Sequence, residues 1–151
     1  MKTEIKVISK EQEERAELFI RKEDKEIRDL VRYLEMEQFR HGILMCQKGK
    51  DICRLHMRAI YYIESVQETQ HIHTEKEVYT TKQRLYSLEK ELPEGFVRIS
   101  KSVILNMEKV KEYRPVMGGM MTAEFPNGEI VYISRKYLKE LRNRIKEGLL
   151  C

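Results

Sequence analysis

The stretch FVRISKSVILN, residues 96–106, decides how the rest of this 151-residue chain is interpreted. Two short runs rich in β-branched residues flank the polar triplet Ser100-Lys101-Ser102, a pattern typical of two strands joined by a loop. The stretch contains no acidic residue, so nothing nearby in the sequence neutralises Lys101. We therefore expect the triplet to present hydroxyl and ammonium donors to water or to a ligand.

A second stretch, ISRKYLKEL at residues 133–141, also places a serine and basic residues directly after an apolar run. Ser134 is predicted to N-cap a final helix. The residues predicted to form the buried stripe of that helix are Leu138, Leu141 and Ile145. Arg135 and Lys136 then fall in the first turn, where each cation is unfavourable by about 0.3–1 kcal/mol. Binding of an anion is the simplest reason to tolerate this cost, although two solvated surface residues would also fit.

The distribution of charge also favours an anionic partner for the last third of the chain. Residues 95–151 contain 11 Lys or Arg and 6 Asp or Glu, whereas residues 51–94 contain 6 and 8. The net charge of +4 alone would be weak support for nucleic-acid binding. Hydroxyl and cationic donors on rigid loops, however, suit phosphate oxygens or base edges in a DNA groove.

The region around these two stretches is predicted to be mostly β. A hairpin is expected from residues 42–47 and 52–57, with Gly49-Lys50-Asp51 as its turn and Cys46 near Cys53. Short strands are also expected at residues 60–66, 69–74, 78–81 and 110–113, and Asn127-Gly128 predicts a second hairpin from residues 120–125 and 129–134.

One helix is expected to interrupt these strands. Thr81 is predicted to N-cap a helix over residues 82–92, which Pro93 ends. Its leucines at positions 85, 88 and 92 share one face, so the helix is expected to pack on the core.

The first 41 residues are predicted to form a small α/β extension, followed by one domain over residues 42–151. Residues 3–8 and 15–21 favour short strands. An amphipathic helix with an acidic first turn follows, and we expect it to cover a sheet. Its apolar stripe consists of Ile27, Leu30, Val31 and Leu34.

Other classes of protein receive little support from the sequence. No run approaches the roughly 18 apolar residues of a membrane span, and the N-terminus does not favour a signal peptide. The three cysteines lack CxxC spacing, which is typical of free thiols. These features together favour the cytoplasm. His71 and His73 lack a third metal ligand at a recognisable spacing. Catalytic and phosphate-loop motifs are also missing, so we expect no enzyme activity, metal, cofactor or small-molecule substrate.

The ordered series IYYIES, HIHT, LEKELPEGFVRISKSVILN, NGE and SRKYLKEL resembles the LytTR-type DNA-binding domain of bacterial transcriptional regulators. The resemblance spans residues 42 to about 150. It implies a mostly β domain with elongated antiparallel β-sheets and flanking helices, whose loops enter successive major grooves. Many members of that family carry a histidine where this chain has Ser100.

The resemblance also implies roles for individual residues. Base contacts are expected from Gln70 in a loop before HIHT, from Lys101 after FVRIS, and from Arg135 at the start of the last helix. The residues expected to support them through contacts with the DNA backbone are Ser100, Ser102, Ser134, Lys136 and His71.

The resulting hypothesis is a sequence-specific regulator that binds double-stranded DNA as a homodimer. The roughly 40 residues before the domain are too few for a phosphate-accepting receiver, so the chain is expected to be of the stand-alone type. The alternative is a cytoplasmic protein-interaction module that partners a membrane protein, with its basic loops bound to an acidic surface.

Overall fold

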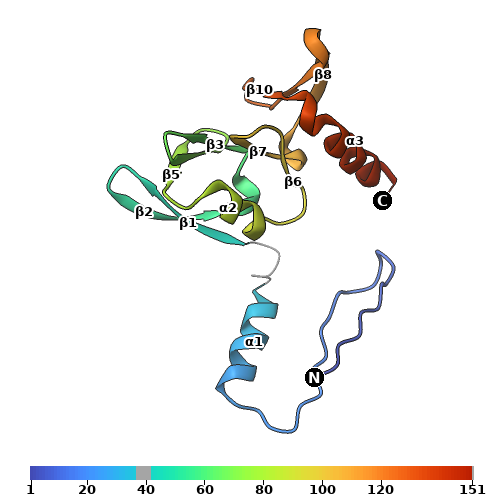
Figure 1. Cartoon of the computed structure of the whole chain (residues 1–151). Helices are drawn as coiled ribbons and strands as arrows, with labels where there is room; N and C mark the ends of the chain where they lie inside the picture. The colour runs from blue at the N-terminus through green and yellow to red at the C-terminus, as the bar shows by residue number, and fades with distance from the viewer. Residues whose placement is uncertain (37–41, 151) are drawn as a thin grey trace. The chain divides into compact units, whose positions relative to one another are not determined.

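The computed structural model describes residues 1–36 and 42–150, and for residues 149 and 150 it describes the backbone alone. The chain divides into two compact units, Met1–Arg40 and His41–Cys151. Figure 1 shows the secondary structure of each unit.

The N-terminal unit contains one helix, α1 (Lys25–Glu35), within its described residues. Asp24 caps α1, because its side chain accepts a hydrogen bond of 3.0 Å from the Ile27 amide. The amphipathic pattern of α1 is as predicted, but none of its residues is buried, so within this unit the helix does not cover a sheet.

The predicted strands at residues 3–8 and 15–21 are wrong, because residues 1–24 form no strand in the structure. The two segments are irregular backbone around a bend where the Gln12 amide donates to the Ser9 carbonyl. Ile5 and Phe19 are 90% and 92% exposed. Apolar alternation stabilises a strand only when a partner strand and a core are available, and the described part of this unit supplies neither.

Within its described residues, the C-terminal unit contains two antiparallel sheets, two α-helices and three short 3-10 helices, which are η2 (Met57–Ala59), η3 (Met107–Lys109) and η4 (Met117–Gly119). The larger sheet has the strand order β2-β1-β5-β4-β3-β7-β6, and the smaller has the order β10-β9-β8. The elements of the larger sheet and its helix are β1 (Ile43–Lys48), β2 (Asp51–His56), β3 (Tyr62–Val66), β4 (Thr69–His73), β5 (Val78–Thr81), α2 (Leu85–Glu91), β6 (Phe96–Arg98) and β7 (Val103–Asn106). The remaining elements are β8 (Glu112–Val116), β9 (Met120–Glu124), β10 (Ile130–Ile133) and α3 (Arg135–Leu150).

Several local predictions are confirmed. Cys46 lies directly opposite Cys53 in the β1–β2 hairpin. The Asn127-Gly128 segment joins β9 to β10, and Gly128 adopts the positive φ of 89° that such a turn requires. Leu138 and Leu141 of α3 are buried, and Ile145 packs against the same core.

The predicted start of the second helix is wrong. Thr81 is the last residue of β5, and α2 begins after Arg84, which makes no side-chain cap. The Thr81 hydroxyl instead accepts a bond of 3.2 Å from the Gln83 amide, two residues along the chain. A threonine in this position can bond to nearby backbone without starting a helix, which explains the error. α2 ends at Glu91 with Leu92 as its C-cap directly before Pro93, one residue short of the predicted end.

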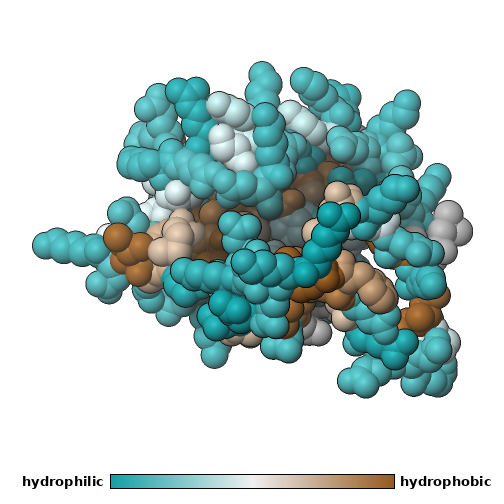
Figure 2. All heavy atoms as spheres, turned by 90° about the horizontal axis from the view of Figure 1, so that it is seen from below, coloured by the Kyte–Doolittle hydropathy of each residue, from teal (hydrophilic) through white to brown (hydrophobic). Residues whose placement is uncertain are grey.

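The larger sheet is covered on both faces at β6 and β7. On one face, Leu85 and Leu88 of α2 pack with Ile63, Ile72 and Ile104. Strand alternation sends the neighbouring residue Leu105 to the other face. There it joins Val97 and the buried residues of the smaller sheet and α3, which are Ala123, Phe125, Val131, Ile133, Leu138 and Leu141. The face of the molecule drawn in Figure 2 is mostly hydrophilic, with separate hydrophobic areas between the polar side chains.

Asn106 connects the end of β7 to the segment before β3. Its side-chain amide donates 2.8 Å to the Ile60 carbonyl, and its side-chain oxygen accepts 3.1 Å from the Glu108 amide. Its own amide donates to the Tyr61 carbonyl at 2.9 Å. A fully buried asparagine is stable here because its side-chain oxygen and nitrogen both have partners.

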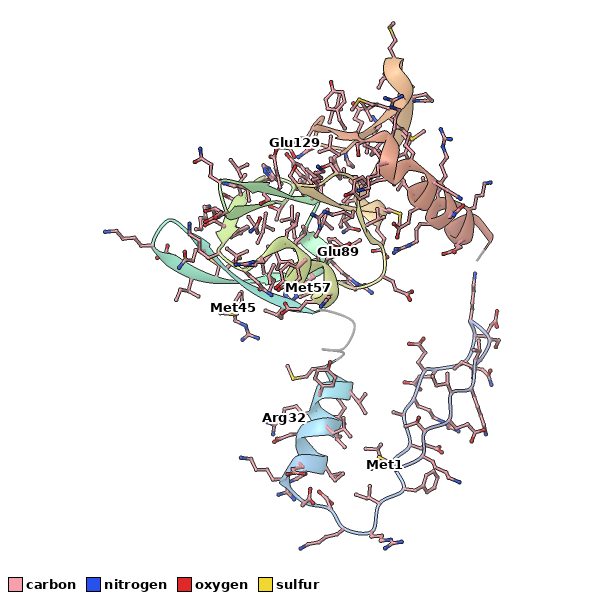
Figure 3. All side chains as sticks on the ribbon, in the orientation of Figure 1. Met1, Arg32, Met45, Met57, Glu89 and Glu129 are labelled. Carbon is pink, nitrogen blue, oxygen red and sulfur yellow. The ribbon has the colours of Figure 1, made fainter. Side chains whose placement is uncertain are left out.

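An aromatic stack links the two sheets. The Tyr62 ring lies 4.1 Å from the His73 ring and 5.6 Å from the Phe125 ring, measured between centroids. Burial lowers the pKa of His73 below 6.5, although the carboxylates of Glu129 and Glu64 oppose that effect and His71 adds to it. Glu129 is labelled in Figure 3. His73 Nδ1 is buried and has no hydrogen-bond partner within the described structure, so a second ring proton would find no acceptor there.

This environment predicts a stability that falls at acidic pH. The pKa of His73 is lower in the folded state, so the unfolded state binds more protons as the pH falls through 6.5. The contribution of neutral His73 is therefore complete above pH 6.5 and is lost progressively below it. We expect His73→Phe, which keeps an aromatic ring, to reduce the loss of unfolding free energy between pH 7 and 5. Urea unfolding at several pH values measures this difference, and identical pH profiles of the two proteins would contradict it.

Candidate nucleic-acid interface

The loop between β6 and β7 is held by hydrogen bonds to each of its four backbone carbonyls. Its first carbonyl, that of Ile99, accepts 2.9 Å from the Ser134 amide, and its last, that of Ser102, accepts 2.7 Å from the Ser65 amide of β3. The two central carbonyls, those of Ser100 and Lys101, both accept from the guanidinium of Arg98. The Lys101 side chain therefore extends from a loop whose backbone is fixed.

The serines of this loop bond to each other. The Ser100 and Ser102 hydroxyl oxygens lie 3.4 Å apart, and the Ser102 amide donates 3.2 Å to the Ser100 hydroxyl. Both side chains are half-buried, whereas Lys101 between them is exposed. The loop thus presents one cation with a hydroxyl on either side.

Ser134 brings the second predicted stretch next to the first. Its amide and its hydroxyl both donate to the Ile99 carbonyl, at 2.9 and 3.3 Å. Ser134 also directly precedes α3, and its carbonyl accepts 3.0 Å from the Tyr137 amide. Residues 100–102 and 134–136, separated by more than 30 positions in the sequence, therefore lie at neighbouring places in the fold.

The three predicted cations of this region are exposed. No carboxylate lies within ion-pair distance of Lys101, Arg135 or Lys136 in the part of the chain that the structure describes. The Lys136 ammonium lies 5.8 Å from the centre of the Tyr137 ring. Arg135 packs closely on Gly119, since a Cβ added to Gly119 would lie only 2.7 Å from Arg135 Cδ. These positive charges are available to an anionic partner.

The structure corrects the predicted position of Gln70. Gln70 lies within β4, opposite Ser65 of β3 and Thr81 of β5, and not in a loop. It is only 3% exposed, and its side-chain oxygen is buried without a hydrogen-bond partner among the described residues. A residue buried to this extent cannot reach a base without rearrangement of its surroundings.

Gln70 is nonetheless at the same end of the sheet as the cationic loop. Ser102 bonds to Ser65, which pairs with Gln70 across β3 and β4. His71 points to the opposite face of β4, because side chains alternate along a strand. It is half-buried and lies opposite Glu64 and Thr80. The turn before β4 consists of Gln67 and Glu68, both exposed and both at positive φ.

Comparison with known proteins identifies the family. Residues 50–146 match the model of the family described as the LytTr DNA-binding domain. The chain belongs to this LytTr family. The resemblance on which the sequence interpretation rested is therefore confirmed.

Relatives and a solved structure agree with this assignment. An uncharacterized HTH-type transcriptional regulator of Staphylococcus aureus strain bovine RF122 / ET3-1 is 30% identical over 96 residues, which cover 64% of this chain and 65% of that protein. Another of the same description, from strain NCTC 8325 / PS 47, is 36% identical over 72 residues, or 48% of this chain and 49% of the relative. The chain thus spans 49–65% of the length of these relatives. A LytTr DNA-binding domain from Bacillus cereus superposes with a TM-score of 0.65 at 22% identity, covering 68% of this chain and 95% of that one, which shows the same fold.

The LytTr fold of this chain contains no helix-turn-helix pair among its described elements. The helices α2 and α3 are separated by the five strands β6 to β10. A recognition helix placed by a preceding helix is therefore absent from residues 42–150.

Arg98 is the residue of this LytTr domain that the sequence interpretation missed. It occupies an alternate position with Phe96 on the face of β6 that α2 covers, where an apolar residue would be usual. An arginine at such a position signals a specific polar partner, and the structure supplies Glu89 of α2 at 3.0 Å.

The described residues show no other kind of site in this region. They contain no group of three His, Cys, Asp or Glu side chains placed to hold a metal ion. In the same residues, no helix is long and apolar enough to cross a membrane.

The burial of Gln70 leads to a test of its role. Gln70→Met keeps the length of the side chain and removes the unsatisfied oxygen, so we expect the unfolding free energy to stay equal or rise by about 1 kcal/mol. We expect the affinity for a specific DNA duplex to change less than about twofold, below the cost of losing a base contact. Thermal unfolding and gel-shift titration measure the two effects. A tenfold loss of affinity in the folded variant would contradict this expectation and support the base contact that the family resemblance implies for Gln70.

Proposed function

We propose that this protein binds double-stranded DNA sequence-specifically and regulates transcription. In this proposal the Ser100–Ser102 loop and the start of α3 enter the major groove, where Lys101 and Arg135 contact bases. The residues that hold the DNA backbone are Ser100, Ser102, Ser134 and Lys136. The observation that carries the proposal is the Ile99–Ser134 contact, which joins two cationic projections that have no acidic partner in the described structure. Membership of the LytTr family and the names of the relatives support it.

The chemistry of these side chains matches the proposed ligand. Arginine and lysine are the common partners of guanine O6 and N7 in the major groove. Backbone amides at a helix start attract phosphate, and Arg135 and Lys136 add to that attraction at the start of α3. The cost of placing two cations there is compensated when DNA is bound.

Substitution of the two proposed base-contacting cations tests this function directly. We expect Lys101→Ala and Arg135→Ala each to weaken binding to the specific duplex by about 1–3 kcal/mol, since each removes a proposed base contact. The duplex is selected with the wild-type protein from a random pool, and gel-shift titration gives the affinities.

A matched control removes one positive charge elsewhere. Lys50→Ala lies in the β1–β2 turn, at the opposite edge of the seven-stranded sheet from β6, and should bind DNA like the wild type. Circular dichroism checks that all variants are folded. Unchanged binding by folded Lys101→Ala and Arg135→Ala variants would contradict the assignment.

The salt dependence of binding separates DNA recognition from the alternative function, in which the basic loops bind an acidic surface of a membrane protein. For duplex DNA we expect log affinity to fall linearly with log salt, because each phosphate contact releases counterions. Absence of duplex binding at any salt concentration would favour the alternative.

We further propose that the protein acts in the cytoplasm as a homodimer on repeated half-sites. Two copies would double the interface and match a repeated operator. Sedimentation equilibrium of the DNA complex should give two protein chains per duplex, and a single chain on the selected duplex would contradict the dimer.

A further inference from the structure

Arg98 uses all three of its guanidinium nitrogens within the protein. Nε donates 2.8 Å to the Ser100 carbonyl, Nη2 donates to the Lys101 carbonyl, and Nη1 lies 3.0 Å from Glu89 Oε2. We propose that Arg98 is a positioning residue that holds the Ser100–Ser102 loop in its DNA-binding conformation, with Glu89 as its anchor on α2. This inference rests on the proposed function and assigns the residue that prepares its loop.

The charge of Arg98 is paired within the protein. Its side chain is 20% exposed, against 45% for that of Glu89 (labelled in Figure 3), and the carboxylate opposes its positive charge. Lys101, in contrast, is exposed and lacks an acidic partner among the described residues. Arg98 therefore acts on DNA through the backbone of Lys101 and not through a phosphate contact of its own.

The loop needs this support at its centre. Ser134 and Ser65 hold its first and last carbonyls, but Arg98 is the donor to both central carbonyls within the described structure. A planar guanidinium can reach several acceptors at once, which a lysine ammonium on a flexible stem does not reproduce. Without Arg98, the backbone at Lys101 must be ordered again whenever DNA binds, and ordering one residue lowers affinity by about tenfold.

The anchor links the loop to the hydrophobic core. Glu89 belongs to α2, and Leu85 and Leu88 of the same helix are buried against the seven-stranded sheet. One path from the core to the centre of the loop therefore runs through the Glu89–Arg98 ion pair and the Arg98 side chain. Disruption at either residue should loosen the same loop.

Four variants test the inference with the duplex selected by the wild-type protein. Arg98→Gln removes the positive charge and the planar set of guanidinium donors, whereas Arg98→Lys keeps the charge and removes the planar set of donors. Glu89→Ala removes the anchor together with a negative charge. Lys50→Gln is the matched control for the loss of one positive charge at the other edge of the sheet. Affinity is measured between 50 and 300 mM salt, and thermal unfolding confirms that each variant is folded.

The expected results differ for positioning and for phosphate contact. We expect Arg98→Gln and Arg98→Lys to bind about tenfold more weakly, each with the salt slope of the wild type. Glu89→Ala should bind about two- to threefold more weakly, although removal of a negative charge would by itself strengthen DNA binding. Wild-type affinity of folded Arg98→Lys, a slope smaller by about one in Arg98→Gln, or tighter binding by Glu89→Ala would overturn the inference.

A measurement on the free protein separates this inference from the proposed function. We expect Arg98→Gln to lower the NMR order parameter of the Lys101 amide from about 0.85 to below about 0.6, with no change in Lys50→Gln. An unchanged order parameter overturns the positioning role even if DNA binds. Loss of order in a protein whose wild type binds no duplex would instead reject the proposed function and leave Arg98 as the support of this loop.

Discussion

Burial of the β6–β7 hairpin on both faces is the constraint on which the C-terminal unit depends. Ile104 belongs to the core beneath α2, and the adjacent Leu105 belongs to the core shared with the smaller sheet and α3. Two hydrophobic cores therefore meet at one short strand. A core side chain cannot shift without disturbing its neighbours. The two strands therefore hold both ends of the β6–β7 loop in fixed positions.

The same constraint explains how a domain made mostly of strands can present a precise polar surface. Ser134 reaches back to Ile99 from the start of α3, and Asn106 joins β7 to the segment before β3. These bonds are made between residues far apart in the sequence, so the cationic side chains keep their spacing only while both cores are intact. Stability and recognition are thus linked through the backbone of β6 and β7, and a destabilising change in either core should also weaken the proposed DNA contact.

Much of this arrangement could be predicted from the sequence where one local pattern had one physical meaning. The apolar runs around Ser100 and Ser102, the Asn127-Gly128 turn and the leucine stripe of α3 all folded as expected. The start of α2 was misplaced, since a threonine can bond to nearby backbone in more than one way. The strands predicted in the first 24 residues needed a partner that the described part of their unit does not contain.

The sequence predicted which cations of the candidate interface are exposed, but it did not predict how all the candidate residues are arranged. Lys101 and Arg135 were expected to be exposed, and they are, but the burial of Gln70 depends on the register of three neighbouring strands. The contacts of Arg98 could not be predicted from the sequence, because they depend on the packing of α2 against β6 and on the direction of two loop carbonyls.

All four backbone carbonyls of the loop between β6 and β7 have hydrogen-bond donors within the protein. Since the carbonyls of Ile99, Ser100, Lys101 and Ser102 already accept hydrogen bonds from the protein, the loop would offer a partner mainly hydrogen-bond donors, above all the Lys101 ammonium. In the major groove of DNA, guanine and thymine expose hydrogen-bond acceptors, whereas cytosine exposes an amino group that donates. In the proposed complex, the backbone of this loop would therefore favour bases that present hydrogen-bond acceptors.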